Sequence, residues 1–124
     1  MTQQMKAQDG RVNMCRKLVD MRSAVGDALG YGFCPSPIVD MLLDLYLAWH
    51  DKRGVYLWSL YMTAHVSTST AHRKVLEMEK DGLLIRECSD RDRRCIGVAI
   101  TAGGLHRVNS LLDRLIGICQ GSPA

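Results

Sequence analysis

The chain has 124 residues, of which 47% are hydrophobic and 23% are charged, and its net charge is +3. This length predicts one domain, and the hydrophobic content is enough for a packed core, which excludes a disordered chain. The pI of about 8.7 is too low to indicate a nucleic-acid-binding protein by charge alone, so any such function depends on where the charges lie.

No segment of the chain has the character of a signal peptide or a membrane span. The first ten residues are polar and lack the apolar core of a signal peptide. The most apolar run, residues 38–49, is interrupted by Asp40 and Asp44 and is too short to cross a bilayer. We therefore expect a soluble, cytoplasmic protein that does not act on membranes.

The residue types that form catalytic or metal sites are scattered along the chain. There are five cysteines, an odd number without a C-x-x-C spacing, and four histidines without the spacing of metal ligands. No serine, histidine and carboxylate grouping and no pair of carboxylates stands out for catalysis. The sequence predicts reduced cysteines and a protein that is not an enzyme, with no metal and no cofactor.

Two long helices are predicted in the first half of the chain, after a flexible arm over residues 1–10. Residues 11–29 carry apolar side chains in steps of four and three, which is the pattern of one helix face. These are Met14, Leu18, Met21, Val25 and Ala28. Ser36 as N-cap and Pro37 at the first helical position predict a second helix. It runs to about Asp51 and is apolar nearly all round, so we expect it to be the central, buried helix.

A short helix, a turn and a well-capped helix are predicted next. Residues 55–56 could form a very short strand, and residues 57–64 are predicted to form a short helix. Ser67 is a good N-cap for a helix that runs to residue 81. Gly82 is the residue expected in the left-handed conformation at the end of that helix.

The last third of the chain predicts a hairpin followed by a helix. Segments 83–88 and 95–100 are strand-like, and Thr101 is the expected N-cap of a helix over residues 102–119. The apolar face of that helix carries Leu105, Val108, Leu112, Leu115 and Cys119.

This order of elements is that of a winged helix-turn-helix. The predicted fold class is mainly α with a small antiparallel hairpin, an α+β arrangement. The whole chain, residues 1–124, is expected to form one winged-helix domain, with the helix-turn-helix and the wing in residues 55–100.

The helix after the turn has the kind of face that reads DNA. On a helical wheel, Ala71, Val75 and Met78 gather on one side, and the opposite side is small and polar first and cationic afterwards. Small residues let the helix approach base edges, and Arg73 can bind guanine or a phosphate. Glu77 is placed to pair with Arg73. The residues predicted to contact double-stranded DNA are Ser67, Thr68, Ser69, Thr70, His72, Arg73 and Lys74; an ordinary solvated helix face is the alternative.

The hairpin tip, residues 89–94, predicts a charged wing. Pairing Cys88 with Cys95 sets Ile85 opposite Val98 and gathers the large apolar side chains on one face. Arginines on a protruding hairpin can enter a minor groove or contact the DNA backbone. The wing residues predicted to do so are Arg91, Arg93 and Arg94. A merely solvated turn is the alternative.

Three short motifs follow one another over residues 66–104. The helix ends in MEKDGLL, the wing carries DRR, and the second strand closes on IT, with Gly104 three residues further on. With these motifs, about residues 36–106 resemble the MarR family of bacterial winged-helix regulators. The resemblance implies a homodimer built from the N- and C-terminal helices, with Arg93 or Arg94 as the wing contact. Ala102-Gly103 replaces the acidic and basic pair that is usual in the family.

The stripes of the two terminal helices, residues 11–29 and 102–119, also predict a homodimer. Each lasts about two heptads, which is too short for an independent coiled coil, but together they could form a joint seam between two chains. Helix-turn-helix proteins commonly read two-fold sites, which favours this arrangement. The alternative is that both helices pack on the central helix of their own chain.

The same residues are compatible with other functions to different degrees. A winged helix can hold another protein with this surface, so a protein-interaction module without DNA binding stays open. A redox-responsive regulator would use Cys88 and Cys95. The C-x5-R spacing from Cys88 to Arg94 matches cysteine phosphatases, but the loop has no glycine and its aspartates would repel phosphate, which excludes this class. The sequence identifies no small-molecule effector.

Overall fold

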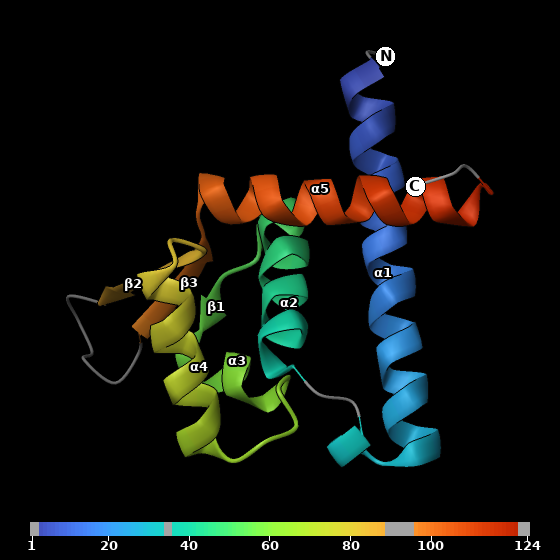
Figure 1. Ribbon diagram of the computed structural model, residues 1–124. Coiled ribbons are helices and arrows are strands. Elements are labelled where there is room, and N and C mark those ends of the chain that lie inside the picture. The colour runs from blue at the N-terminus through green and yellow to red at the C-terminus, as the bar shows by residue number, and fades with distance from the viewer. Residues whose placement is uncertain (1–2, 34–35, 89–95, 122–124) are drawn as a thin grey trace. The chain divides into compact units, whose positions relative to one another are not determined.

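The computed structural model describes residues 3–33, 36–88 and 96–121. In chain order the elements are α1 (Gln3–Leu29), the 3-10 helix η1 (Tyr31–Phe33), α2 (Pro37–Asp51), β1 (Val55–Tyr56), α3 (Leu57–Met62), α4 (Thr68–Lys80), β2 (Leu84–Cys88), β3 (Ile96–Ile100) and α5 (Ala102–Cys119) (Figure 1). The predicted fold class is confirmed. The single domain expected from the length comes as two compact units: the winged-helix unit, residues 35–105, and the terminal unit, residues 1–34 and 106–124.

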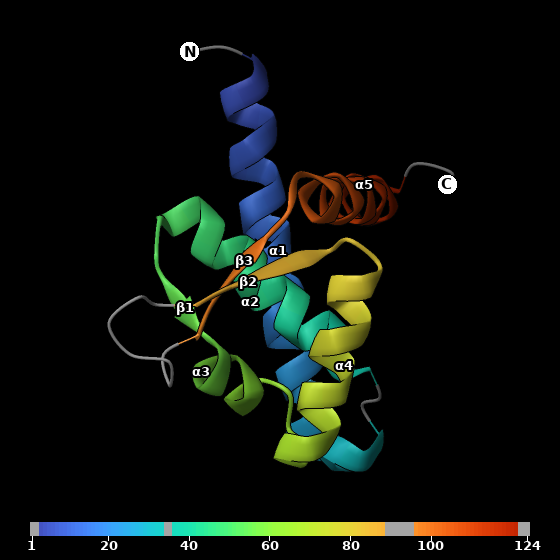
Figure 2. The same ribbon diagram turned by 90° about the vertical axis from the view of Figure 1, so that its left-hand side faces the viewer.

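The winged-helix unit is a three-stranded antiparallel sheet packed against α2, α3 and α4. The strand order is β1-β3-β2, so β3 lies in the middle, and Figure 2 shows β2 and β3 side by side. Every element contributes to the core. Fully buried side chains include Met41 of α2, Leu60 of α3, Met78 of α4 and Leu84 of β2. As its apolar sequence predicted, α2 is a main contributor to this core.

The hairpin pairs one residue away from the predicted register. Cys88 lies opposite Ile96, whereas the prediction paired it with Cys95. A shift of one residue exchanges the two faces of a strand. Ile85, which was expected on the buried face, is therefore 46% exposed, and Leu84 is buried instead.

The observed register also turns Arg86 toward α4. Residues 83–85 are apolar at three successive positions, so alternation alone does not select the buried face. Arg86 is two residues from Leu84 and shares its face. On that face its guanidinium Nη2 lies 2.9 Å from Oε1 of Glu79 in α4. The observed register thus buries Leu84 and places an ion pair between the helix and the strand.

The ends of the helices follow the predicted signals in most cases. The Ser67 hydroxyl accepts a hydrogen bond from the backbone N–H of Thr70 (3.2 Å), which confirms it as the N-cap of α4. Gly82, with φ of +76°, follows that helix as predicted. Pro37 opens α2, but the prediction of Ser36 as its N-cap is wrong. Ser36 has a left-handed backbone (φ 84°) rather than the extended one that capping needs, and its side chain makes no capping hydrogen bond.

Thr101 and Gly104 fasten the wing to the end of α4. The Thr101 hydroxyl donates to the carbonyl of Gly82 (2.5 Å) and accepts from the N–H of Gly104 (2.9 Å), which confirms Thr101 as the N-cap of α5. The N–H of Thr101 donates to the carbonyl of Leu83 (3.0 Å). A Cβ on Gly104 would lie 2.3 Å from that carbonyl oxygen, so a larger residue does not fit. We call this arrangement the Thr101–Gly104 clasp.

The terminal unit consists of α1, η1 and most of α5. Helix α1 begins at Gln3, so residues 3–10 are helical and the predicted flexible arm is wrong for them. Their glutamine, methionine, lysine and alanine residues are good helix formers, which explains the longer helix. Arg11 of α1 donates two hydrogen bonds of 2.8 Å to Asp113 of α5. None of the helices in the described ranges has the length and apolar character that a membrane crossing requires.

The two predicted stripes of the terminal helices are only partly buried. On α1, Met14 is buried, but Met21 is 51% exposed and Val25 is 41% exposed. On α5, Val108 and Leu112 are buried within the single chain. These two residues therefore belong to the interior of one chain and not to the surface on which a second chain would pack.

Candidate nucleic-acid interface

Helix α4 separates a buried face from an exposed one along its whole length. Ala71, Val75 and Met78 have no exposed surface and anchor the helix in the core. Of the predicted DNA contacts on this helix, Ser67, Thr68, Ser69, His72 and Arg73 are exposed, and Thr70 and Lys74 are half buried. These seven residues lie at the N-cap and in the first two turns of α4, around the face that Ala71 and Val75 bury.

The hydroxyl groups at the start of α4 divide into two kinds. The Ser67 hydroxyl, besides capping the helix, donates to the hydroxyl of Thr70 (2.9 Å) and lies 3.3 Å from that of Ser69. Ser67 and Thr70 therefore stabilise the helix start itself. Thr68 makes no such contact within the described residues, so its hydroxyl and the shared hydroxyl of Ser69 are the ones best placed to meet a ligand.

Arg73 is an exposed cation of this face that no carboxylate of the described residues engages. The ammonium of Lys74 lies 3.3 Å from a carboxylate oxygen of Glu77. The predicted pair of Glu77 with Arg73 is thus wrong: both cations are one turn away from the glutamate, and the half-buried Lys74 is the one that reaches it. Among the residues that the structure describes, Arg73 has no hydrogen bond or ion pair, and its guanidinium is exposed.

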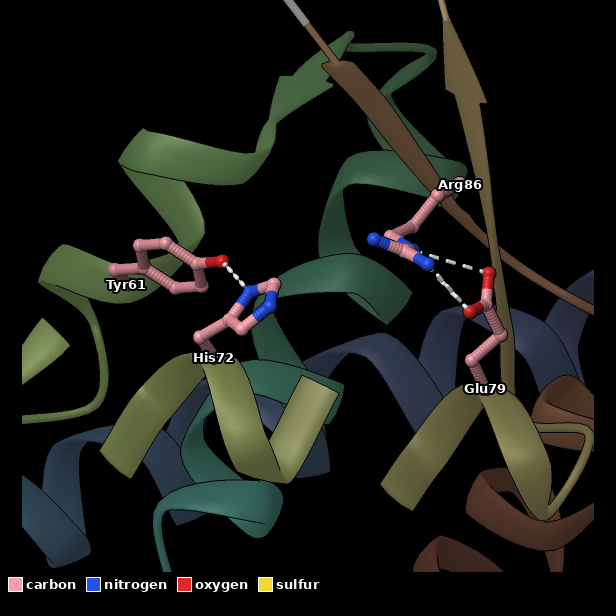
Figure 3. Close-up of polar contacts among 4 residues, drawn as sticks. All are labelled: Tyr61, His72, Glu79 and Arg86. Atoms are coloured by element: carbon pink, nitrogen blue, oxygen red, sulfur yellow. Dashed lines mark hydrogen bonds and ion pairs between the residues drawn. The ribbon is translucent and has the colours of Figure 1, made fainter. Parts of the chain in front are cut away.

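The second carboxylate of the helix is engaged by the wing. Glu79 accepts hydrogen bonds of 2.9–3.2 Å from Nε and Nη2 of Arg86 in β2 (Figure 3). Hydrogen bonding to Arg86 lowers the pKa of Glu79, and the same bonds raise the pKa of Arg86. A carboxylate that would repel phosphate is therefore compensated by an arginine. Arg86 was not predicted as part of the site, because its role depends on a strand register that differs from the predicted one.

A second contact joins the two helices of the helix-turn-helix. The hydroxyl of Tyr61 in α3 lies 2.5 Å from Nδ1 of His72, and the two rings meet edge to face (Figure 3). Burial raises the pKa of Tyr61, and the nearby Arg86 opposes this rise. Tyr61 was not predicted as part of the site, because a tyrosine on a short helix carries no sequence signal for such a contact.

The tip of the wing lies outside the described residues. Arg91, Arg93 and Arg94 are in this segment, and so is Cys95, so their predicted contacts stay predictions. Cys88 at the end of β2 is exposed. Within the described ranges, no three histidine, cysteine or acidic side chains gather in a way that could hold a metal ion.

No protein-family model and no curated protein matches this sequence, but solved structures match its fold. MepR of S. aureus in its DNA-binding conformation has a TM-score of 0.60 at 17% identity, over 82% of this chain and 73% of MepR. A MarR family transcriptional regulator from Silicibacter pomeroyi has a TM-score of 0.53 at 24% identity, over 82% of this chain and 68% of the other. The fold is that of the MarR regulators.

A further match shows how far the MarR fold extends in this chain. A MepR mutant from a multidrug-resistant S. aureus clinical isolate has a TM-score of 0.56 at 16% identity. The match covers 65% of this chain, which spans only 56% of the length of that protein. In this MarR fold, α3 and α4 form the helix-turn-helix, and β2 and β3 form the wing.

Proposed function

We propose that the protein is a sequence-specific transcriptional regulator that binds double-stranded DNA, with residues 67–81 in the major groove. The observation that carries this proposal is the charge arrangement of α4. Both glutamates of the helix are engaged by cations, Glu77 by Lys74 and Glu79 by Arg86. Arg73 is left exposed without a carboxylate partner among the described residues. The similarity of fold to MepR in its DNA-binding conformation supports it.

Within this proposal, α4 and the wing do different work. Arg73 follows a first turn of small side chains, so it can reach base edges. Arg91, Arg93 and Arg94 contact a minor groove or the backbone, and they add affinity without much sequence preference.

Titration of variants against a site selected from random DNA, and against a scrambled site, tests this proposal. Arg73→Ala should cost about 1–3 kcal/mol of binding free energy at the selected site and relax the preference at one position. Lys80→Ala is the matched control, because it removes one exposed positive charge near the C-terminal end of the same helix. Affinity that does not depend on salt for the wild-type protein would contradict DNA binding altogether.

The proposed regulator acts as a homodimer through the terminal unit. Its exposed large apolar side chains include Met21, Val25 and Leu29, which recur every four residues along α1. Leu111 and Ile118 are exposed one heptad apart on α5. A second chain that packs on these residues would remove about 25 cal/mol of unfavourable hydration per Å² of apolar area. Its half-sites would lie about 10–10.5 base pairs apart, or a multiple of this distance.

The mass of the protein in solution tests the dimer. Val25→Glu should give a monomer, whereas Ser23→Glu, an equally exposed position two residues earlier on the same helix, should stay a dimer. A monomeric wild-type protein at micromolar concentration would contradict the proposal.

A protein-interaction module is the second candidate, and one observation favours it. Trp58 is 63% exposed and Met62 is 75% exposed, one turn apart on α3. Large side chains at this exposure are typical of surfaces that another protein covers. Salt-dependent retention of the protein on DNA, unchanged in Trp58→Ser, would favour the regulator over this module.

A further inference from the structure

The contact between Tyr61 and His72 lies at the edge of the proposed DNA-binding face. The ring of Tyr61 is half buried and packs against the core of the winged-helix unit. Its hydroxyl lies 2.5 Å from Nδ1 of His72, and the ring centroids are 6.0 Å apart with an interplanar angle of 90°. His72 is exposed, and its Nε2 has no partner within the described part of the chain. The hydroxyl of Tyr61 thus contacts Nδ1 of His72, while Nε2 of the same ring is available to a ligand.

The contact with the phenol favours one tautomer of the neutral imidazole. The Tyr61 hydroxyl has no second hydrogen-bond partner among the described residues, so its O–H forms a hydrogen bond to one of them only if it donates to Nδ1. Nδ1 then supplies a lone pair, and the single hydrogen of neutral His72 lies on Nε2. Burial raises the pKa of Tyr61, and Arg86 opposes this only in part, so the phenol keeps its proton at neutral pH.

We propose that Tyr61 is a positioning residue for DNA recognition, which holds His72 as an Nε2–H donor toward an acceptor atom of bound DNA. This inference rests on the DNA binding proposed above. The acceptors of this chemistry are phosphate oxygens and the N7, O6 and O4 atoms of the major groove. An imidazole without Tyr61 presents either nitrogen, so part of its population offers an acceptor, which no phosphate oxygen can use.

The surroundings of His72 suit an electron-rich ligand. Arg73 is its neighbour in the chain and carries a positive charge that no described residue neutralises. The N-terminus of α4, where backbone N–H groups point outward, is about one turn away. A donor at Nε2 adds to this set, whereas an acceptor there would oppose it.

A double-mutant cycle on the full chain tests the proposal. Tyr61→Phe, His72→Ala and the double variant are titrated against duplexes carrying the selected site and a scrambled site. Each single variant should lose about two- to tenfold in affinity, because one hydrogen bond is lost or misplaced. The double variant should lose no more than His72→Ala alone, since Tyr61 acts only through the imidazole. Loss at both duplexes identifies a phosphate acceptor, and loss at the selected site alone identifies a base.

A conservative variant separates positioning from structural support. In His72→Gln the side-chain amide offers a donor near the position of Nε2 that does not depend on Tyr61. Adding Tyr61→Phe to this variant should leave its affinity unchanged, whereas a merely structural role of the hydroxyl would lower it in both backgrounds. If loss of the hydroxyl lowers stability, His72→Ala against His72→Gln still tests the donor, because His72 is exposed. Additive losses in the cycle, or equal affinity of these two variants and the wild type, would overturn the proposal. A wild-type protein that binds neither duplex would overturn the proposed function instead.

Discussion

The two units differ in how far their helices are buried, although each unit leaves large apolar side chains exposed, such as Trp58 and Met62 in the winged-helix unit. In the winged-helix unit, α2, α3, α4 and β2 all place side chains in one core with at most 1% exposure. In the terminal unit, α1 is the longest helix, with 27 residues, yet few of its side chains are buried. The large apolar side chains that it leaves exposed are Met5, Met21, Val25 and Leu29.

This difference indicates that the two units need different surroundings. The helices and strands of the winged-helix unit share one core. A long helix that is buried at one part and apolar at another is complete only when something covers it. The stability of the first unit should therefore not depend on protein concentration, whereas that of the second should, if a second chain is the cover.

The largest effect on the free energy of unfolding should come from truncating one methionine to alanine in each unit. Met41→Ala truncates a side chain with no exposure in the winged-helix core and should cost about 2–5 kcal/mol in the free energy of unfolding. Met21→Ala makes the same truncation at a residue that is 51% exposed. It should cost at most about 0.5 kcal/mol within the single chain, but it should weaken the dimer. Urea denaturation at several protein concentrations measures both, and equal losses that do not depend on concentration would remove the distinction.

The next effect tests the Thr101–Gly104 clasp. Gly104→Ala forces a Cβ against the backbone carbonyl of Leu83 and should cost about 1–3 kcal/mol or more. Gly103→Ala is the control, because its Cβ would meet the nearest atom at 3.4 Å. It should be neutral or stabilise α5 by up to about 1 kcal/mol. Thermal unfolding compares the two variants. Equal melting temperatures would mean that the Thr101–Gly104 clasp accommodates the added Cβ without loss of stability.

A smaller effect concerns how the long helix of each unit ends. Helix α1 is followed by Gly30 and α2 by Lys52, and both residues have a left-handed backbone, with φ of 99° and 55°. Only the glycine adopts this conformation without a steric cost. Gly30→Ala should therefore destabilise the protein by about 1 kcal/mol, and Lys52→Gly should stabilise it by about 0.5–1 kcal/mol. Lys52→Ala controls for the lost charge. A denaturation midpoint for Lys52→Gly below that of the wild type would contradict a steric cost of the left-handed backbone at Lys52.

The smallest effect is the acid sensitivity of one ion pair in each unit. Hydrogen bonds from Arg11 lower the pKa of Asp113 below its ordinary 3.8, and those from Arg86 lower the pKa of Glu79 below 4.5. Each pair therefore stabilises the protein fully above the ordinary value, and this contribution is lost as the pH falls through the lowered one. Asp113→Asn should cost about 0.2–1 kcal/mol at pH 7, as surface pairs do. Its free energy of unfolding should also fall less than that of the wild type on acidification; an identical pH profile would show that the pair contributes nothing.

The sequence was sufficient for those parts of the fold that depend on local signals. Ser67, Gly82 and Thr101 predicted the ends of their helices, because caps depend on residues within one turn. The apolar sequence of α2 predicted its buried position, since a helix that is apolar all round has no solvated face. Most of the seven candidate contacts at the start of α4 are exposed, as expected from a buried face with a clear helical period.

The errors occurred where a distant side chain decides between local alternatives. Three successive apolar residues left two registers open for β2, and the observed one pairs Arg86 with Glu79, which lies in another element. The pairing of Glu77 depended on which of two cations is half buried, and this is a property of the packed helix. Ser36 has a good N-cap residue type, but its backbone is left-handed. The contact of Tyr61 with His72 joins two helices and has no signature in either.

The ion pair between Glu79 and Arg86 also has a consequence for how this sequence can change. Because it joins a helix and a strand, losing either charge alone leaves the other without its partner at a half-buried position. Substitutions accepted during evolution should therefore occur at both positions together. Among chains of this fold that share the register, the two positions should covary, and a reversed pair, Glu79→Arg with Arg86→Glu, should be tolerated better than either single change.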